Sequence, residues 1–124
     1  MKKARIAEVR KHIEINFSLN NPLSTSVSFE RNITLDFIPD EMIVRQISYR
    51  VITTETDVYI INSDLVNGDL GTFFIFPNFL FNETIFPIKK PIIGLYTFSI
   101  RKQPSSAITG VGNLSLHLEF IKYR

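Results

Sequence analysis

The sequence predicts an all-β fold, an antiparallel sandwich of two sheets with about eight strands. From residue 12 onward, apolar and polar residues alternate with a period of two, the pattern of strands with one buried face. Turn-forming residues separate the alternating stretches at short intervals. Strand patterns do not alternate with helical ones, which argues against a parallel α/β sheet. The 124 residues are enough for one domain with its own core.

The first half of the chain contains three expected strands. The segment HIEINFSL (12–19) places its apolar residues at every second position. After the turn NNPLS, the alternation returns in TSVSFERNITLDFI (25–38) and keeps its phase throughout, which is compatible with one long, bent strand. The residues PDE at 39–41 interrupt the pattern. MIVRQISYRVIT (42–53) follows, rich in the β-branched and aromatic residues that favour strands.

The second half of the chain supplies the remaining strands. VYIINS (58–63) and TFFIF (72–76) flank a loop whose Asn-Gly pair is a strong tight-turn signal. ETIFPI (83–88) is short, and its proline predicts an edge position or a strand end. LYTFSIRK (95–102) and NLSLHLEFIKY (113–123) complete the set. Among antiparallel sandwiches, a single jelly roll of about eight strands is the arrangement that we expect first.

A basic segment precedes the first alternating stretch. Residues 1–11 carry five basic residues and one acidic residue, 5 − 1 = +4, whereas the whole chain has a formal net charge of +2. The pattern of residues 2–11 is weakly helical. We therefore expect a short basic N-terminal arm (1–11) attached to a β-sandwich domain (12–124). Such an arm suits an anionic partner, namely nucleic acid, an acidic protein surface or lipid head groups, with a solvated tail as the alternative. Its attachment residues would be Lys2, Lys3, Arg5, Arg10 and Lys11.

The segment TFFIF is apolar at every position after Thr72. A strand with one face in water should alternate, and a two-layer sandwich covers only one face of each sheet. We therefore expect a subunit interface at Phe73, Phe74, Ile75 and Phe76. The alternatives are that the arm or a loop covers this strand, or that it lines a pocket for an apolar ligand. No apolar stretch reaches the roughly 18 residues of a membrane-spanning helix, so no membrane span is expected.

The sequence contains no catalytic signature. Cysteine is absent, and neither a nucleophile motif nor a Gly-rich phosphate loop is found. The chain has two histidines, each in an alternating stretch that points it outward, and each has a glutamate two residues further on. If the first and last strands pair, His12, Glu14, His117 and Glu119 would cluster. Because two histidines on separate end strands are a small ligand set, we expect no metal, no cofactor and no enzymatic activity.

Four fragments, FIPDEMIVRQISY, VYIINSDLVNGDLGTFF, KKPIIGLYTFSI and LSLHLEFIKYR, resemble the single jelly-roll capsid proteins of virophages and polinton-like double-stranded DNA viruses. The penton (vertex) and minor capsid proteins are the most similar in pattern. The resemblance covers roughly residues 12–124, implies no catalytic residue, and leaves no room for the inserted domain of a larger penton.

This resemblance implies a structural virion protein that is located in the capsid and assembled inside the host cell. Its partners would be other copies of the chain, as a pentamer or another homo-oligomer, and a neighbouring major capsid protein. The arm would add non-specific nucleic-acid contact. Two alternatives remain: a non-catalytic sandwich that binds carbohydrate or protein, and a small metal-dependent barrel of the cupin type, for which the histidines are too few.

Overall fold

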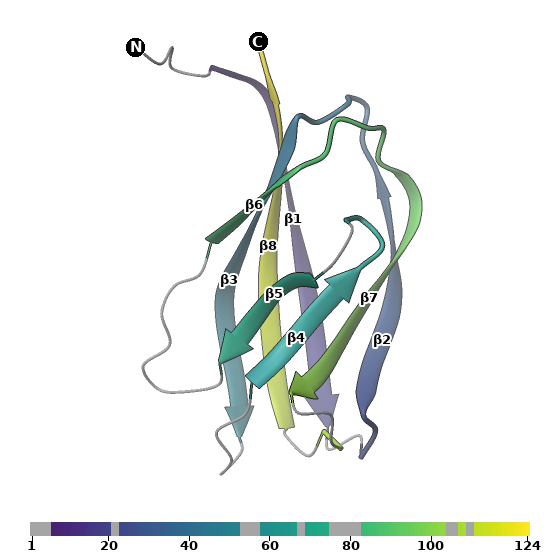
Figure 1. Ribbon diagram of the computed structural model, residues 1–124, viewed down its shortest axis with the longest axis vertical. Helices are drawn as coiled ribbons and strands as arrows, with labels where there is room; N and C mark the ends of the chain where they lie inside the picture. The colour runs from purple at the N-terminus through teal and green to yellow at the C-terminus, as the bar shows by residue number, and fades with distance from the viewer. Residues whose placement is uncertain are drawn as a thin grey trace.

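A computed structural model describes residues 6–20, 23–52, 58–66, 69–74, 83–103, 107–108 and 111–124 (Figure 1). These residues form strands and no helix, which confirms the predicted all-β class, and they include no helix that is long and apolar enough to cross a membrane. The described strands are β1 (Ala7–Asn20), β2 (Ser26–Thr34), β3 (Glu41–Ile52), β4 (Val58–Ser63), β5 (Asp69–Phe74), β6 (Glu83–Pro87), β7 (Ile93–Gln103) and β8 (Val111–Tyr123).

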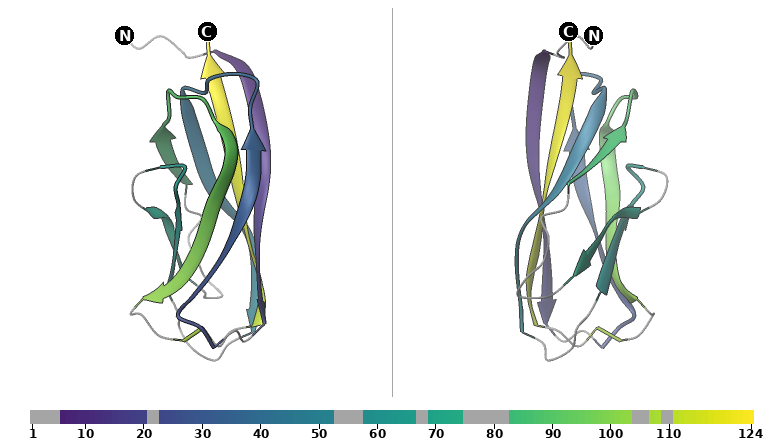
Figure 2. Two further views of the ribbon diagram at one scale, coloured as in Figure 1. Left: turned by 90° about the vertical axis from the view of Figure 1, so that its right-hand side faces the viewer. Right: turned by 60° about the vertical axis from the view of Figure 1, so that its left-hand side comes forward.

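The strands form two four-stranded sheets that face each other as the layers of a sandwich (Figure 2). The first sheet has the order β1-β8-β3-β6 and the second β2-β7-β4-β5, with every neighbouring pair antiparallel. The chain thus pairs its first strand with its last, its second with its seventh, its third with its sixth and its fourth with its fifth. Because β1 pairs with β8 from Ala7↔Tyr123 to Asn20↔Val111, β1 begins and β8 ends at the same end of the molecule.

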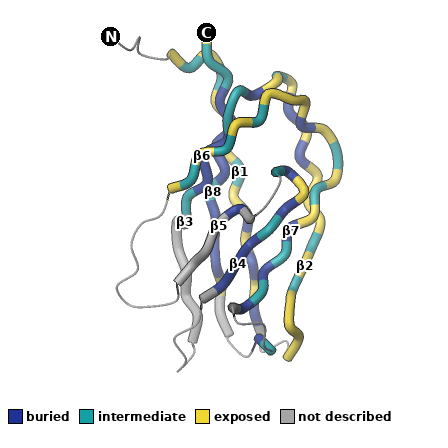
Figure 3. The backbone as a smooth tube through the Cα atoms, viewed as in Figure 1, coloured by how far each residue is buried: buried dark blue, intermediate teal, exposed yellow. Residues whose placement is uncertain are grey.

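The core lies between the two sheets and follows the predicted alternation. On β8, Leu114, Leu116, Leu118 and Phe120 are fully buried, and β4 contributes Tyr59 and Ile61 from the opposite layer (Figure 3). The ring of Phe29 on β2 links the two layers. Its centroid lies 5.1 Å from that of Phe17 in an edge-to-face contact and 5.8 Å from that of Phe98 in a stacked one. Such aromatic pairs stabilise a core beyond the area that they bury.

Part of the expected N-terminal arm is a strand in the structure. Residues 7–11, expected to be weakly helical and to belong to the arm, form the start of β1 and pair with the end of β8. The segment VRKHI (9–13) has too few apolar residues for its sequence to indicate a strand. Pairing with β8 stabilises the strand conformation of residues 7–11 instead. Arg10 and Lys11 are therefore strand residues, whereas Lys2, Lys3 and Arg5 lie outside the described residues.

Two other local predictions have clear outcomes. The strand expected over residues 25–38 ends at Thr34. The amide of the next residue, Leu35, donates to the carbonyl of Ile92 at 2.9 Å and connects the end of β2 to the segment between β6 and β7. The short strand β6, which ends in Pro87, is an edge strand as predicted.

The Phe-rich stretch is only partly described. β5 is an edge strand of the second sheet, in which Phe73 pairs with Tyr59 and Phe74 with Val58. The side chains of Phe73 and Phe74, and residues 75–82 with Ile75 and Phe76, lie outside what the structure describes. The expected interface at these residues therefore stays a prediction.

Candidate functional site

The outer face of the first sheet carries an unusual row of charged and imidazole side chains. His12 on β1 lies opposite Glu119 on β8, and Glu14 lies opposite His117 in the neighbouring row. Arg45 on β3 continues the row of His117. The predicted condition is met: the first and last strands pair, and the outward positions of both H-x-E stretches meet on one face.

The two histidine rings are in direct contact. The His12 Nδ1 atom lies 2.6 Å from His117 Nε2, and the ring centroids are 4.7 Å apart. At this distance one ring nitrogen donates its proton to the lone pair of the other. Burial lowers the pKa of His117 below its usual value, and the charges of His12 and Arg45 lower it further. The neutral form of His117 is therefore favoured.

Glu119 is the buried anion of this face. Only 5% of its side chain is exposed. Its Oε1 atom accepts a hydrogen bond from Arg10 Nη1 at 2.7 Å, and its Oε2 atom lies 3.4 Å from both Arg45 Nη1 and His12 Nδ1. The alternation correctly predicts that Glu119 points away from the core. It does not predict the burial, which arises because long side chains from the two neighbouring strands converge on this carboxylate.

Arg45 ties this cluster to the edge of the sheet. Its Nε atom donates to Glu83 Oε2 on β6 at 2.7 Å, and this hydrogen bond raises the pKa of the guanidinium above its usual value. Arg45 thus contacts both a half-exposed carboxylate on β6 and the buried carboxylate on β8. Sequence reasoning missed Arg45 because only the register of three strands brings it to this position.

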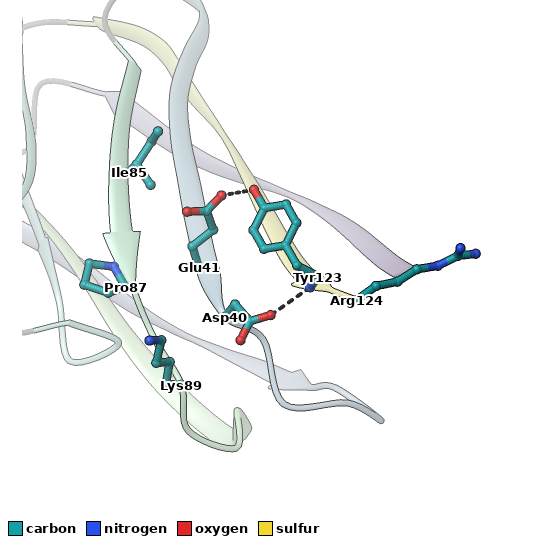
Figure 4. Close-up of a pocket in the computed structure, with 7 residues that line it drawn as sticks. All are labelled: Asp40, Glu41, Ile85, Pro87, Lys89, Tyr123 and Arg124. Atoms are coloured by element: carbon teal, nitrogen blue, oxygen red, sulfur yellow. Dashed lines mark hydrogen bonds between the residues drawn. The ribbon is translucent and has the colours of Figure 1, made fainter. Parts of the chain in front are cut away.

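A shallow pocket of about 420 Å³ lies at one end of the same sheet (Figure 4). Tyr123 forms one wall, where its hydroxyl donates to Glu41 Oε1 and its amide donates to Asp40 Oδ2 at 2.7 Å. Both apolar and charged side chains line the pocket. The ring of Tyr123 therefore lies beside groups that can form hydrogen bonds. The lining residues are Asp40, Glu41, Ile85, Pro87, Lys89, Tyr123 and Arg124.

The outer face of the second sheet is more apolar at one place. Ile93 and Leu95 lie two residues apart on β7 and are 65% and 62% exposed. Their neighbours across the β2–β7 pairing are Thr34 and Asn32. A single exposed apolar residue is common on protein surfaces, but two adjacent ones such as Ile93 and Leu95 are typical of a surface that contacts a partner.

Two of the five expected attachment residues lie within the described part of the chain. Arg10 is bound to Glu119, and Lys11 is exposed on β1 opposite Phe120. The remaining three basic residues of the expected arm lie outside the described residues.

Within the described residues, the two candidate sites are the charged cluster around Glu119 and the pocket beside Tyr123.

No known protein family, no curated protein and no solved structure matches this chain.

Proposed function

We propose that this protein is a self-assembling structural protein of the single jelly-roll class, a penton or minor capsid component of a virus particle. The observation that carries the proposal is the pairing of the strands, β1 with β8, β2 with β7, β3 with β6 and β4 with β5. This order arises when a ribbon of four antiparallel pairs folds over into two sheets, as in the eight-stranded jelly rolls of capsid proteins. The sequence resemblance points to the same class.

Exposed apolar side chains on the outer sheet faces support self-assembly. Ile93 and Leu95 on the second sheet and Ile85 on the first are each more than half exposed. Covering side chains of this size in a contact between copies is worth about 1–2 kcal/mol each. Three or four such residues per copy provide a large part of the free energy that a weak, repeated capsid contact needs.

The basic residues before β1 fit the role of an attachment segment. In this proposal Lys2, Lys3 and Arg5 contact nucleic acid or an acidic surface of a neighbouring major capsid protein, and the mature location is the virion. Their effect should weaken with salt, because exposed charges are screened over about 10 Å at moderate ionic strength.

The test is the solution mass of the purified chain, measured by light scattering at increasing concentrations. The proposal expects a homo-oligomer with a fixed number of copies, or a concentration-dependent approach to one. A chain that stays monomeric at all concentrations, and that also fails to bind capsid shells assembled without it, would exclude a structural role.

The pocket beside Tyr123 favours a second candidate, a non-catalytic binding module for carbohydrate or protein. An aromatic face next to Asp40, Glu41 and Lys89 is the arrangement that holds a sugar ring by stacking and hydrogen bonds. A glycan-binding screen distinguishes the candidates. Specific binding that is lost in Tyr123→Ala and retained in Ile93→Ser would favour the binding module.

A further inference from the structure

We propose that His12, His117 and Glu119 form a binding site for a divalent first-row transition metal ion, with zinc as the best fit. This site is independent of the assembly function proposed above. Its three candidate ligand atoms, one from each residue, all lie within 4.8 Å of one another. They come from two hydrogen-bonded strands that lie at opposite ends of the sequence, so the fold and not the local sequence assembles the set.

Two of the three ligand–ligand distances are close to those that a tetrahedral ion needs, and all three lie within 4.8 Å. Two ligands bound to zinc at 2.0–2.1 Å lie roughly 3.3 Å apart. His12 Nδ1 is 3.4 Å from Glu119 Oε2, which already fits. His12 Nδ1 and His117 Nε2 are 2.6 Å apart, so the two rings must separate by roughly 0.7 Å to admit the ion. Small rotations of two side chains on a sheet surface achieve this without moving the backbone.

The tautomers of the two rings also suit a metal. A metal ligand nitrogen must be free of its proton. In the hydrogen-bonded pair, one of the two facing nitrogens holds a proton. Binding moves that proton to the other nitrogen of the same ring, so that both facing nitrogens become available and neither ring becomes charged.

The surroundings of Glu119 leave one oxygen for the ion. Arg10 holds Oε1 at 2.7 Å and thereby orients the carboxylate, as groups behind a ligating carboxylate commonly do. Arg45 approaches Oε2 at 3.4 Å, a long contact, while its closer bond at 2.7 Å is to Glu83. An ion at Oε2 therefore displaces only the weaker of the two contacts of Arg45.

The formal charges around the histidines balance. Three carboxylates face three guanidinium groups, 3 − 3 = 0, and they belong to Glu14, Glu83, Glu119, Arg10, Arg45 and Arg31. Arg31 of β2 donates to the backbone oxygen of Glu14 at 2.7 Å. Because 53% of the His12 side chain is exposed, water can reach the fourth position of the ion.

The composition of the chain makes the test simple. The protein has two histidines and no cysteine, so any imidazole-dependent metal binding reports this site. Zinc chloride is titrated by calorimetry into the full chain after chelator treatment, and visible absorption of Co²⁺ then reports tetrahedral coordination. We expect one ion per chain, and a melting temperature that rises with zinc because the ion binds the folded state.

Matched variants identify the ligands. His12→Gln and His117→Gln should each weaken zinc binding by at least about 10–100-fold, the range that loss of even an indirect partner of a metal costs. Glu83→Gln, which removes a nearby carboxylate that is no ligand, should leave the affinity within a few-fold of the wild type. Because the His12 side chain is more than half exposed, His12→Gln should keep the fold, and circular dichroism checks this.

Two results would overturn the assignment. One is a wild-type protein that binds no zinc and gives no tetrahedral Co²⁺ spectrum. The other is binding of equal strength by the wild type and both folded histidine variants, which would place the ion on surface carboxylates elsewhere.

Discussion

Glu119 lies on an outward position of β8, yet its side chain is as buried as many core residues. A carboxylate removed from water needs partners, because an unpaired buried charge is strongly destabilising. Arg10 and Arg45 supply them from the strands on either side of β8. This single residue therefore links three neighbouring strands on the outer face of the first sheet.

The first prediction concerns this carboxylate. Glu119→Gln should lower the free energy of unfolding by about 1–2 kcal/mol, because hydrogen bonds to a charged group become neutral ones in a buried position. Glu83→Gln is the control, since Glu83 also contacts Arg45 but 42% of its side chain is exposed. It should cost less than about 1 kcal/mol. Urea unfolding measures the free energy of unfolding of both variants. Equal decreases in the two would show that the burial of Glu119 does not strengthen its interactions.

The second prediction concerns pH in the metal-free protein. Burial lowers the pKa of His117 in the folded state, so the unfolded chain binds this proton more readily than the folded chain. The resulting stability is fully present above the unfolded pKa of about 6.5 and is lost as the pH falls below it. The urea midpoint should therefore drop between pH 7.5 and pH 5.5 in the presence of chelator. His117→Gln should reduce that drop, and an unchanged drop would contradict the assigned cause.

At the level of single strands, the alternation of apolar and polar residues predicts the features that depend only on residues close in sequence. The strand character of β1 from His12 onward and the apolar face of β8 follow from a period of two, and the edge position of β6 follows from its proline. The start of β1 does not, because residues 7–11 gain their strand conformation from pairing with the end of β8, more than 100 positions away. Long-range pairing of this kind leaves no trace in the local pattern.

The third prediction separates arm from strand. Deleting residues 2–5 should leave the melting temperature nearly unchanged, since β1 begins at Ala7. Deleting residues 2–11 should lower it clearly, because this removes the pairing of Val9, Arg10 and Lys11 with β8 and leaves Glu119 without Arg10. Thermal unfolding by circular dichroism compares the two. If both deletions behave alike, residues 7–11 contribute no strand pairing that matters for stability.

At the scale of the whole molecule, the sequence predicts the class of fold better than the candidate site. Each H-x-E stretch is visible in the sequence, but its meaning depends on whether β1 and β8 are neighbours. Arg45 reaches Glu119 only because the register of β3 places it beside His117. The pocket beside Tyr123 forms only because β6 supplies Ile85 and Pro87 to its lining. Features that join several strands require the topology, which a single sequence constrains only weakly.

The last prediction decides which surface of the second sheet joins copies of the chain. The Phe-rich end of β5 is at one side of this sheet, and Ile93 and Leu95 on β7 are separated from it by β4. By the period of two, Phe73 and Ile75 are expected on one face of this strand and Phe74 and Phe76 on the other, with one pair in the core and the other at a subunit interface.

Of the double variants Phe73→Ser, Ile75→Ser and Phe74→Ser, Phe76→Ser, the one that alters the core pair should unfold. The other should give a folded monomer if the β5 side forms the contact, and Ile93→Ser, Leu95→Ser should do so if β7 forms it. The Asn32→Ser, Thr34→Ser variant, altered beside Ile93 and Leu95 without loss of an apolar side chain, is the control and should assemble normally. Light scattering and circular dichroism measure mass and fold. If both outer-face variants assemble like the wild type, neither surface joins the copies, because removing about 1–2 kcal/mol per covered side chain must weaken a contact that depends on it.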